Sequence, residues 1–123
     1  MTDFTDLADR YIAMWNETDA RRRRDIIARL WADNASYVDP LMSGTGAAAI
    51  DDMVQGVQQR FPGHRFHRTS DVDAHNRCLR FAWELRPEAG KEPLVAGIDF
   101  GMVAADGRLQ AITGFLDRVP AAA

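Results

Sequence analysis

The spacing of apolar residues changes along this sequence, from helical in the first half to alternating in the second. Three early segments carry apolar residues three or four positions apart, which predicts amphipathic helices. Their apolar positions are Phe4, Leu7, Ala8, Tyr11, Ile12 and Trp15 in the first, Ile26, Ile27, Leu30 and Trp31 in the second, and Ile50, Met53, Val54, Val57 and Phe61 in the third. We expect Asp19 to cap the second helix and Pro62-Gly63 to end the third.

From His64 onward the period is two, which predicts strands. Expected strands cover residues 35–39, 64–73, 78–86, 94–104 and 109–117, with 43–46 as a turn and 87–93 as a loop. Asp106-Gly107 is a strong hairpin signal between the last two strands. Helices followed by antiparallel strands predict an α+β domain whose helices pack on one face of a sheet, and a curved sheet of this kind can enclose a pocket.

Length and charge narrow the class of protein. The chain has 123 residues, a hydrophobic fraction of 46% and a net charge of −3, which fit one globular domain. We expect this domain to cover residues 1–119, with 120–123 as a flexible tail. No apolar run is long enough to cross a membrane, and the acidic N-terminus is unlike a signal peptide, so we expect a cytoplasmic protein. The acidic balance argues against nucleic acid or membrane as a partner, and the basic run Arg21–Arg24 is expected to be a solvated helix face.

Several chemistries lack the residues they need. The single cysteine, Cys78, excludes an internal disulfide and, inside a strand, is expected to be structural. His64 and His67 would point to opposite faces of one strand and His75 lies in a turn, so no metal site is expected. The glycine-containing turn at 43–46 lacks the lysine of a phosphate loop. We therefore expect neither a metal nor an organic cofactor.

Three polar residues stand out as candidates for chemistry. Asp99 lies inside the apolar run 95–100, where a carboxylate either faces solvent or sits in a pocket with a raised pKa. Asp39 ends a strand before Pro40 and is either a turn residue or a catalytic one. Tyr11 lies on the apolar face of the first helix, either as a core residue or with its hydroxyl at a site. The residues expected to line the pocket are Trp15, Met42, Met53, Val54, Phe61, Phe66 and Trp83.

The segments that hold these candidates resemble the nuclear-transport-factor-2-like superfamily over nearly the whole chain. The similar stretches are 10–13, 30–35 running on to Val38-Asp39-Pro40, 43–45, 96–100 and 107–113. The resemblance implies a cone-shaped α+β domain with N-terminal helices packed in the concave face of a strongly curved, mostly antiparallel sheet. It also implies a deep pocket for a small hydrophobic or partly polar molecule, and a homodimer formed through the sheet.

Within this superfamily the motifs are similar to those of two kinds of enzyme. Resemblance to ketosteroid isomerase implies that Asp39 is a general base and that Tyr11 and a protonated Asp99 donate hydrogen bonds to an oxyanion. Resemblance to SnoaL-like polyketide cyclases implies that Asp99 is itself the acid/base group. Both imply proton transfer next to a carbonyl without a cofactor. Val54 departs from the isomerase pattern, which can supply a second tyrosine at that place.

Two further interpretations remain open. An enzyme similar to limonene-epoxide hydrolase needs two aspartates around an arginine, and Arg80 with Asp99 would supply part of that set. A non-catalytic binding or dimerisation module needs no acid/base group, and its aromatic residues would belong to the core or to an interface. Arg80, Glu84 and Arg86 alternate along one strand face. That face is either the pocket, which would imply a polar or anionic ligand, or the solvent side.

Overall fold

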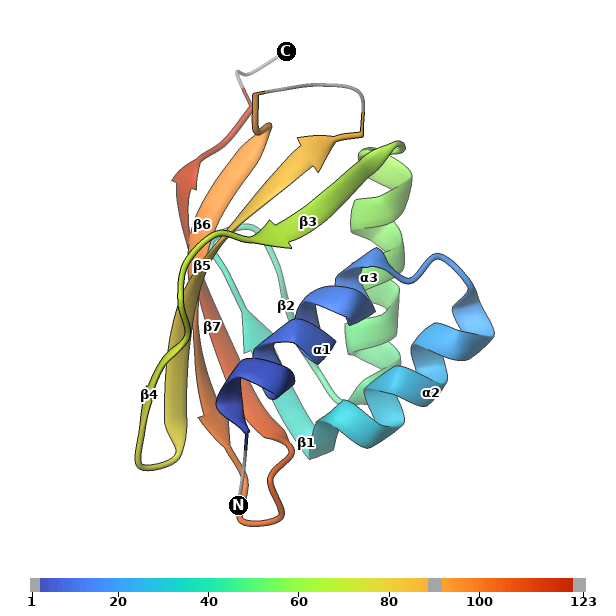
Figure 1. Ribbon diagram of the computed structural model, residues 1–123. Coiled ribbons are helices and arrows are strands. Elements are labelled where there is room, and N and C mark those ends of the chain that lie inside the picture. Colours follow the sequence, from blue (N-terminus) through green and yellow to red (C-terminus); the bar gives the residue numbers. More distant parts are fainter. Residues whose placement is uncertain (1–2, 89–91, 121–123) are drawn as a thin grey trace.

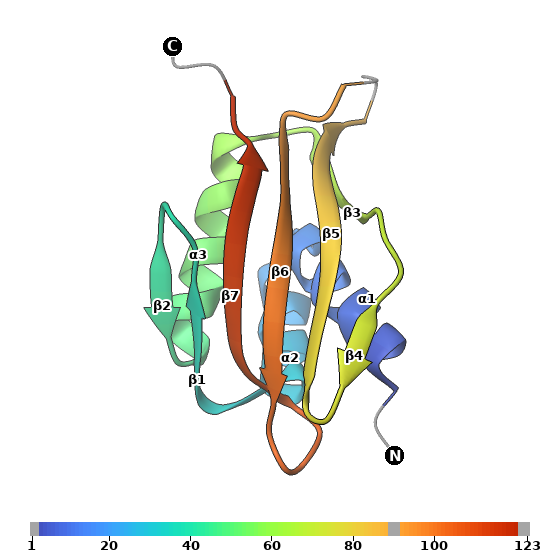
Figure 2. The same cartoon turned by 90° about the vertical axis from the view of Figure 1, so that its left-hand side faces the viewer.

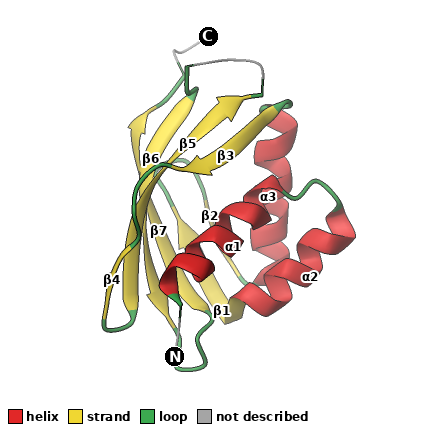
Figure 3. Cartoon of the chain, viewed as in Figure 1, coloured by secondary structure: helices red, strands yellow, loops and turns green. Residues whose placement is uncertain are grey.

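The computed structural model describes residues 3–88 and 92–120, which form three helices and one seven-stranded sheet (Figures 1 and 3). The helices are α1 (Phe4–Asn16), α2 (Ala20–Leu30) and α3 (Ala47–Arg60). The strands are β1 (Trp31–Val38), β2 (Ser43–Thr45), β3 (His64–Arg68), β4 (Asp73–His75), β5 (Cys78–Pro87), β6 (Val95–Val103) and β7 (Leu109–Arg118). Residues 89–91 of the expected loop and 121–123 of the expected tail lie outside the described residues.

The sheet is mixed and curved, and its strand order is β2-β1-β7-β6-β5-β3, with β4 as a second partner of β5. β1 and β7 run parallel, whereas the other described pairs are antiparallel. The three helices lie on one face of the sheet, and Figure 2 shows the other face uncovered. The predicted α+β class, with helices against one side of a mostly antiparallel sheet, is confirmed.

The helices begin where local signals place them. The carboxylate of Asp19 accepts a hydrogen bond from the Arg22 N–H at 2.9 Å, which confirms the predicted cap of α2. Gly46 precedes α3 with a φ of 88°, a conformation that favours glycine, and its N–H donates to the Ala35 carbonyl at 2.8 Å. This hydrogen bond holds the beginning of α3 next to β1. No helix within 3–88 and 92–120 is long and apolar enough to cross a membrane.

The largest difference from the predicted strand boundaries is at β1, and a predicted turn contains a further strand. β1 begins at Trp31 rather than Ala35, and its pairing with β7 shifts register before Ser36, where Asn34 has a φ of 57°. Such a bulge interrupts the alternation from which a strand is read. The segment predicted as a turn at 43–46 contains β2, which pairs with the end of β1.

The single strand predicted over 64–73 is divided into β3 and β4. Both pair with β5, β3 near the end of that strand and β4 near its start. Between them the Ala82 N–H donates to the hydroxyl of Ser70 at 2.8 Å, so a side chain takes the place of a backbone acceptor there. This side-chain hydrogen bond interrupts the backbone pairing with β5 between β3 and β4.

The basic run Arg21–Arg24 was expected to be a solvated face of α2, and this prediction is wrong for one residue, Arg23. Arg23 is only 2% exposed, and its guanidinium forms an ion pair with Asp51 at 2.6 Å. It also donates to Gln58 Oε1 at 3.1 Å and to the Glu17 carbonyl at 3.0 Å. Arg23 shares a helix face with buried Ile27, one turn later, and so joins α2 to α3. The other three arginines of the run are exposed, as predicted.

Candidate active site

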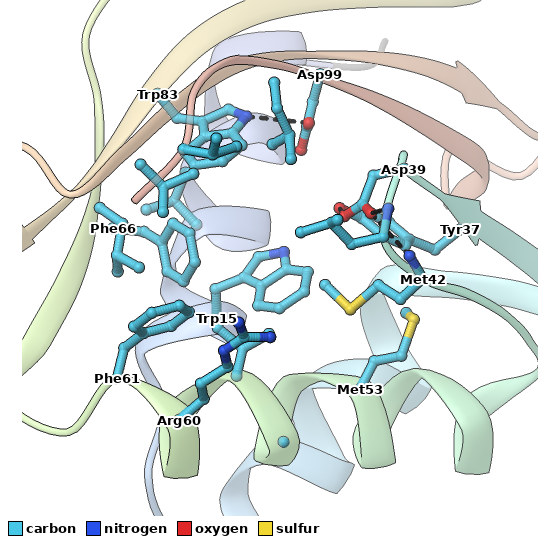
Figure 4. Close-up of a pocket in the computed structure, with 18 of the residues that line it drawn as sticks. Trp15, Tyr37, Asp39, Met42, Met53, Arg60, Phe61, Phe66, Trp83 and Asp99 are labelled. Carbon is cyan, nitrogen blue, oxygen red and sulfur yellow. Dashed lines mark hydrogen bonds between the residues drawn. The ribbon is translucent and has the colours of Figure 1, made fainter. Parts of the chain in front are cut away.

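A cavity of about 370 Å³ lies between the helices and the inner face of the sheet (Figure 4). Its lining residues are Tyr11, Ile12, Trp15, Tyr37, Asp39, Leu41, Met42, Met53, Gly56, Val57, Arg60, Phe61, Phe66, Trp83, Leu85, Val95, Asp99, Leu116, Val119 and Pro120. Most are apolar, and the charged ones among them are two aspartates and one arginine. An apolar cavity with a few polar groups is the usual form of a small-molecule site.

Asp99 lies on the sheet side of this cavity. Buried and exposed residues alternate along β6, which turns Asp99 inward and leaves 3% of it exposed. The Tyr11 hydroxyl donates to Oδ2 at 2.7 Å, and the Trp83 indole N–H donates to Oδ1 at 3.0 Å. Burial raises the pKa of Asp99 to about 6, because desolvation disfavours the charged form. The two hydrogen bonds act in the opposite direction, and the charge of Asp39 adds to the rise.

Tyr11 is held in place by aromatic neighbours. Its ring centroid lies 5.9 Å from that of Phe81, 6.0 Å from that of Trp31 and 6.4 Å from that of Trp15. Burial, and after it the charge of Asp99, raises the pKa of Tyr11 well above its usual value. The phenol therefore keeps its proton and stays a donor to Asp99 throughout the physiological pH range.

Asp39 closes a tight turn at another wall of the cavity. Its Oδ1 accepts from the backbone N–H groups of Leu41 and Met42, at 2.7 and 3.0 Å. Its Oδ2 accepts from the Tyr37 hydroxyl at 2.7 Å. The backbone bonds are typical of an aspartate turn, and together the three occupy most acceptor positions of the carboxylate. Asp39 is thus a half-buried turn residue that also lines the cavity.

A glycine lets the two aspartates approach each other. Gly114 of β7 pairs with Asp99, and a Cβ at this position would lie 2.9 Å from Asp99 Oδ1 and 3.2 Å from Asp39 Cβ. It would also lie 3.3 Å from the Tyr37 hydroxyl. Any larger residue would push at least one of these groups aside. The missing side chain of Gly114 therefore makes the room in which the polar groups gather.

The structure brings the three candidate residues, Tyr11, Asp39 and Asp99, to one cavity. Six of the seven residues expected to line a pocket also do so: Trp15, Met42, Met53, Phe61, Phe66 and Trp83. Val54 does not. It is fully buried in the core, because a helix turns by about 100° per residue and Val54 faces inward beside the position from which Met53 reaches the cavity.

Sequence reasoning did not single out Tyr37 or Arg60. Tyr37 lies two residues before Asp39 in a strand, so the alternation of side chains could have placed both on one face. Arg60 lies three residues after Val57 on α3, a spacing that shares a helix face. The spacing of both residues is visible in the sequence. It identifies them as cavity residues only once the face of the strand or helix that meets the cavity is known.

Arg80 lies on the opposite face of the sheet from Asp99. The register of β5 and β6 pairs Arg80 with exposed Phe100, and its guanidinium binds Asp73 at 3.1 Å. Glu84 and Arg86 lie on this outer face too, because they alternate with the buried residues of β5, and their side chains are 30% and 36% exposed. The charged face of β5 is therefore the solvent side of the sheet. The hypothesis that Arg80 joins Asp99 in an epoxide-opening set is therefore wrong. Within the described residues, no three histidine, cysteine or acidic side chains cluster as a metal site.

Comparisons with known proteins point to one family. A family model of the SnoaL-like domain matches residues 8–112. A crystal structure from Agrobacterium tumefaciens, named a "putative isomerase of the SnoaL-like family", is 40% identical to this chain. The match covers 90% of this chain and 94% of that one, with a TM-score of 0.86. No curated protein matches the chain.

More distant structures share the fold. An NTF2-like protein of unknown function from Exiguobacterium is 20% identical, over 90% of this chain and 98% of that one, with a TM-score of 0.72. A "putative polyketide cyclase" from Sinorhizobium meliloti is 13% identical, over 89% and 93% of the two chains, with a TM-score of 0.69. At these identities the likeness shows the fold alone, which is the cone of helices and curved open sheet.

Proposed function

The chain belongs to the SnoaL-like domain family, and from this premise we propose that it transfers a proton next to a carbonyl group of a small, mainly apolar molecule, without a cofactor. The observation that carries the proposal is Asp99, a carboxyl group buried at an apolar cavity with a pKa of about 6. A general acid/base works best when its pKa lies near the working pH, because it must both accept and release a proton. The isomerase name of the structure that is 40% identical to this chain agrees with this reaction class.

We assign the proton transfer to Asp99 rather than to Asp39. Each oxygen of Asp99 accepts one hydrogen bond and keeps another acceptor position for a proton. Oδ1 of Asp39 already accepts two backbone bonds, and Oδ2 accepts one from Tyr37. Apolar surroundings also raise the free energy of an ionised carboxylate, which increases the tendency of Asp99 to take up a proton.

In the proposed reaction a carbonyl compound binds with its α-carbon facing ionised Asp99. The carboxylate removes the α-proton and becomes neutral; the C–H electrons form a C=C bond, and the carbonyl π electrons move to the oxygen. Where the substrate carries a C=C bond between its β- and γ-carbons, the enolate is a dienolate. Protonated Asp99 then returns the proton to the γ-carbon, the C=O bond re-forms and the C=C bond moves to the α- and β-carbons, which isomerises the substrate. In a cyclisation, the enolate carbon instead attacks a second carbonyl, and the proton goes to the alkoxide formed. Tyr11 and Trp83 hold the carboxylate in position.

The test is hydrogen–deuterium exchange next to the carbonyl of small ketones and lactones, followed by NMR in D₂O. We expect the native chain to accelerate exchange, and Asp99→Asn to slow it by about 10²–10⁴-fold, the usual contribution of a positioned general base. Asp39→Asn is expected to slow it by less than about tenfold, because asparagine can preserve the turn. Asp33→Asn is the matched control, since Asp33 is 95% exposed, and its rate should equal that of the native chain.

Other results would redirect the assignment. If Asp39→Asn abolishes exchange and Asp99→Asn retains it, the roles are those of ketosteroid isomerase, with Asp39 as the base. If the native chain binds compounds of the panel and exchanges none of them, a non-catalytic binding module is the better description.

We also propose that two copies pair through the uncovered face of the sheet. On this face Ile98, Phe100, Met102 and Phe115 are 37–57% exposed, and Ile98 pairs directly with Phe115 across β6 and β7. Neighbouring apolar side chains of this kind mark an interaction surface, and the superfamily resemblance implies a second copy as the partner. Light scattering at micromolar concentration should give twice 13.7 kDa, and Phe115→Glu should give 13.7 kDa. A single-chain mass for the native protein would contradict the dimer.

A further inference from the structure

The exposed side of the cavity carries a positive charge that no described carboxylate neutralises. Arg60, in the last turn of α3, is the only basic residue among the described lining residues. It is exposed, and no carboxylate within 3–88 and 92–120 lies at ion-pair distance from it. The five N–H donors of a guanidinium need acceptors, and here they are available to a ligand.

The surroundings of Arg60 strengthen its attraction for an anion. Its Cζ atom lies 5.4 Å from the centre of the Phe61 ring, and the lining residues one turn before it on the same helix, Gly56 and Val57, are uncharged. A charge beside apolar surface interacts more strongly with an opposite charge than one surrounded by water. The interaction remains partly screened, because Arg60 also contacts solvent.

The charges of the cavity would orient a ligand. Figure 4 shows Arg60 rising from α3 on the other side of Trp15 from Asp99. Asp39 and Asp99 repel an anionic group from their part of the cavity, whereas Arg60 attracts it. A ligand with one anionic end would therefore place that end at Arg60 and its uncharged end toward Asp99.

We propose that Arg60 binds a carboxylate of the substrate, so that the substrate is an oxo acid: an apolar body with a carboxylate at Arg60 and a carbonyl facing Asp99. The planar guanidinium presents paired N–H groups that match the two oxygens of a carboxylate. The position of the carbonyl rests on the proposed function. The carboxylate contact does not, because it follows from the charge and place of Arg60 alone.

Arg60 also has a structural role to be separated from this one. A basic residue in the last turn of a helix interacts favourably with the helix dipole. Arg29 occupies the same place in α2 and does not line the cavity, so Arg29→Met is the matched control. Arg60→Lys keeps the positive charge but loses the paired donors, whereas Arg60→Met loses both.

The experiment measures binding by tryptophan fluorescence, since Trp15 and Trp83 line the cavity. The probes are 9-oxodecanoate, its methyl ester, and decanoate, which lacks the ketone. We expect both acids to bind about tenfold more tightly than the ester, as a hydrogen-bonded charge pair allows. Arg60→Met should weaken the acids by about tenfold and leave the ester within about twofold, with Arg60→Lys between the two. Arg29→Met should change nothing, and the preference should fall as salt is raised.

Three results would each overturn the proposal. The native chain could bind 9-oxodecanoate and its ester equally, it could show no binding of 9-oxodecanoate, or Arg60→Met could bind this acid as tightly as the native chain does. The outcome is independent of turnover. A carboxylate preference that depends on Arg60, together with no proton exchange in any ketone, would leave this inference standing and contradict the proposed function. Proton exchange without a carboxylate preference would support the proposed function and contradict this inference.

Discussion

Two tyrosine–aspartate pairs line the same cavity with the same hydrogen-bond length of 2.7 Å, yet they differ in how they are built. Tyr11 and Asp99 are 88 positions apart in the chain and almost fully buried. Tyr37 and Asp39 are neighbours at the end of one strand, and Asp39 is also bonded to the backbone of its own turn. The residue types are identical. Their difference in chemistry comes from the surroundings.

Burial of the ionised Asp99 carboxylate works against folding, whereas the hydrogen-bonded turn at Asp39 supports it. The raised pKa of Asp99 means that its ionised form is less favourable in the folded chain than in the unfolded one. The hydrogen bonds of Asp39 stabilise a connection that the fold needs between β1 and β2. A group that is unfavourable for stability and faces a cavity is a candidate for function, and this comparison leads us to favour Asp99.

The largest expected effect is the dependence of stability on pH. The pKa of Asp99 is raised from 3.8 to about 6 on folding. Between these values the unfolded chain binds fewer protons than the folded chain, so stability falls as pH rises through the window, by about 3 kcal/mol in total, and the penalty is absent below it. Urea unfolding from about pH 4 to 7.5 should show this decline in the native chain relative to Asp99→Asn. If the free energies of unfolding of the native chain and of Asp99→Asn depend on pH in the same way, burial does not destabilise the ionised form of Asp99. The control, Asp33→Asn, should show the same pH dependence as the native chain.

A substitution at Gly114 should disturb both pairs together. In Gly114→Ala the new Cβ would meet Asp99 Oδ1 at 2.9 Å and Asp39 Cβ at 3.2 Å, so one or both side chains must move. We expect a loss of about 1–3 kcal/mol in the free energy of unfolding, as for other overpacked sites. Gly56→Ala is the control for unfolding, since no atom lies within 4 Å of its added Cβ and alanine favours a helix. Equal stability of the two variants would argue against crowding at Gly114.

Removing each tyrosine hydroxyl should separate the two pairs. The Tyr11 hydrogen bond lowers the pKa of Asp99, so its loss in Tyr11→Phe should raise that pKa further, by about one unit. Tyr37→Phe leaves both donors to Asp99 in place and should leave its titration almost unchanged. Carboxyl-carbon NMR gives both midpoints directly. The comparison fails if the two variants shift the midpoint of Asp99 equally.

The smallest effect is expected at the turn. Asparagine can accept the two backbone hydrogen bonds that Asp39 Oδ1 receives, so Asp39→Asn should change the free energy of unfolding by less than about 1 kcal/mol. Asp39→Ala leaves both N–H groups without their acceptor and should cost about 1–3 kcal/mol. Thermal or urea unfolding of the two variants tests this. Similar losses in both would mean that the charge of Asp39, rather than the turn, stabilises the chain.

Local patterns were sufficient for much of the framework. The alternation over residues 78–86 predicted the strand β5, and the cap at Asp19 began α2 as expected. Both signals depend on residues within a few positions of each other. The bulge in β1 and the side-chain acceptor at Ser70 broke the pattern locally, and there the predicted boundaries differed.

Where a residue's role depended on a distant partner, local patterns were not sufficient. Arg23 is an arginine in a basic run, and only Asp51 and Gln58 on another helix make it a buried link. Val54 and Met53 are adjacent apolar residues of α3, and only the packing of that helix decides that one lies in the core and the other at the cavity. Neither outcome is encoded in the spacing of apolar residues along a helix.

The sequence by itself determined the main order of helices and strands and the single-sided packing that follows from their periods, because these depend on backbone geometry and on nearest neighbours. It left open whether Asp99 faces the cavity or the solvent. Only the tertiary structure decided that Asp99 is desolvated and held by Tyr11 and Trp83, and that Asp39 is occupied by its own turn. The physical reason is that the free energy of a charge depends on every group and every water molecule around it in space, and folding brings those groups together from distant parts of the chain.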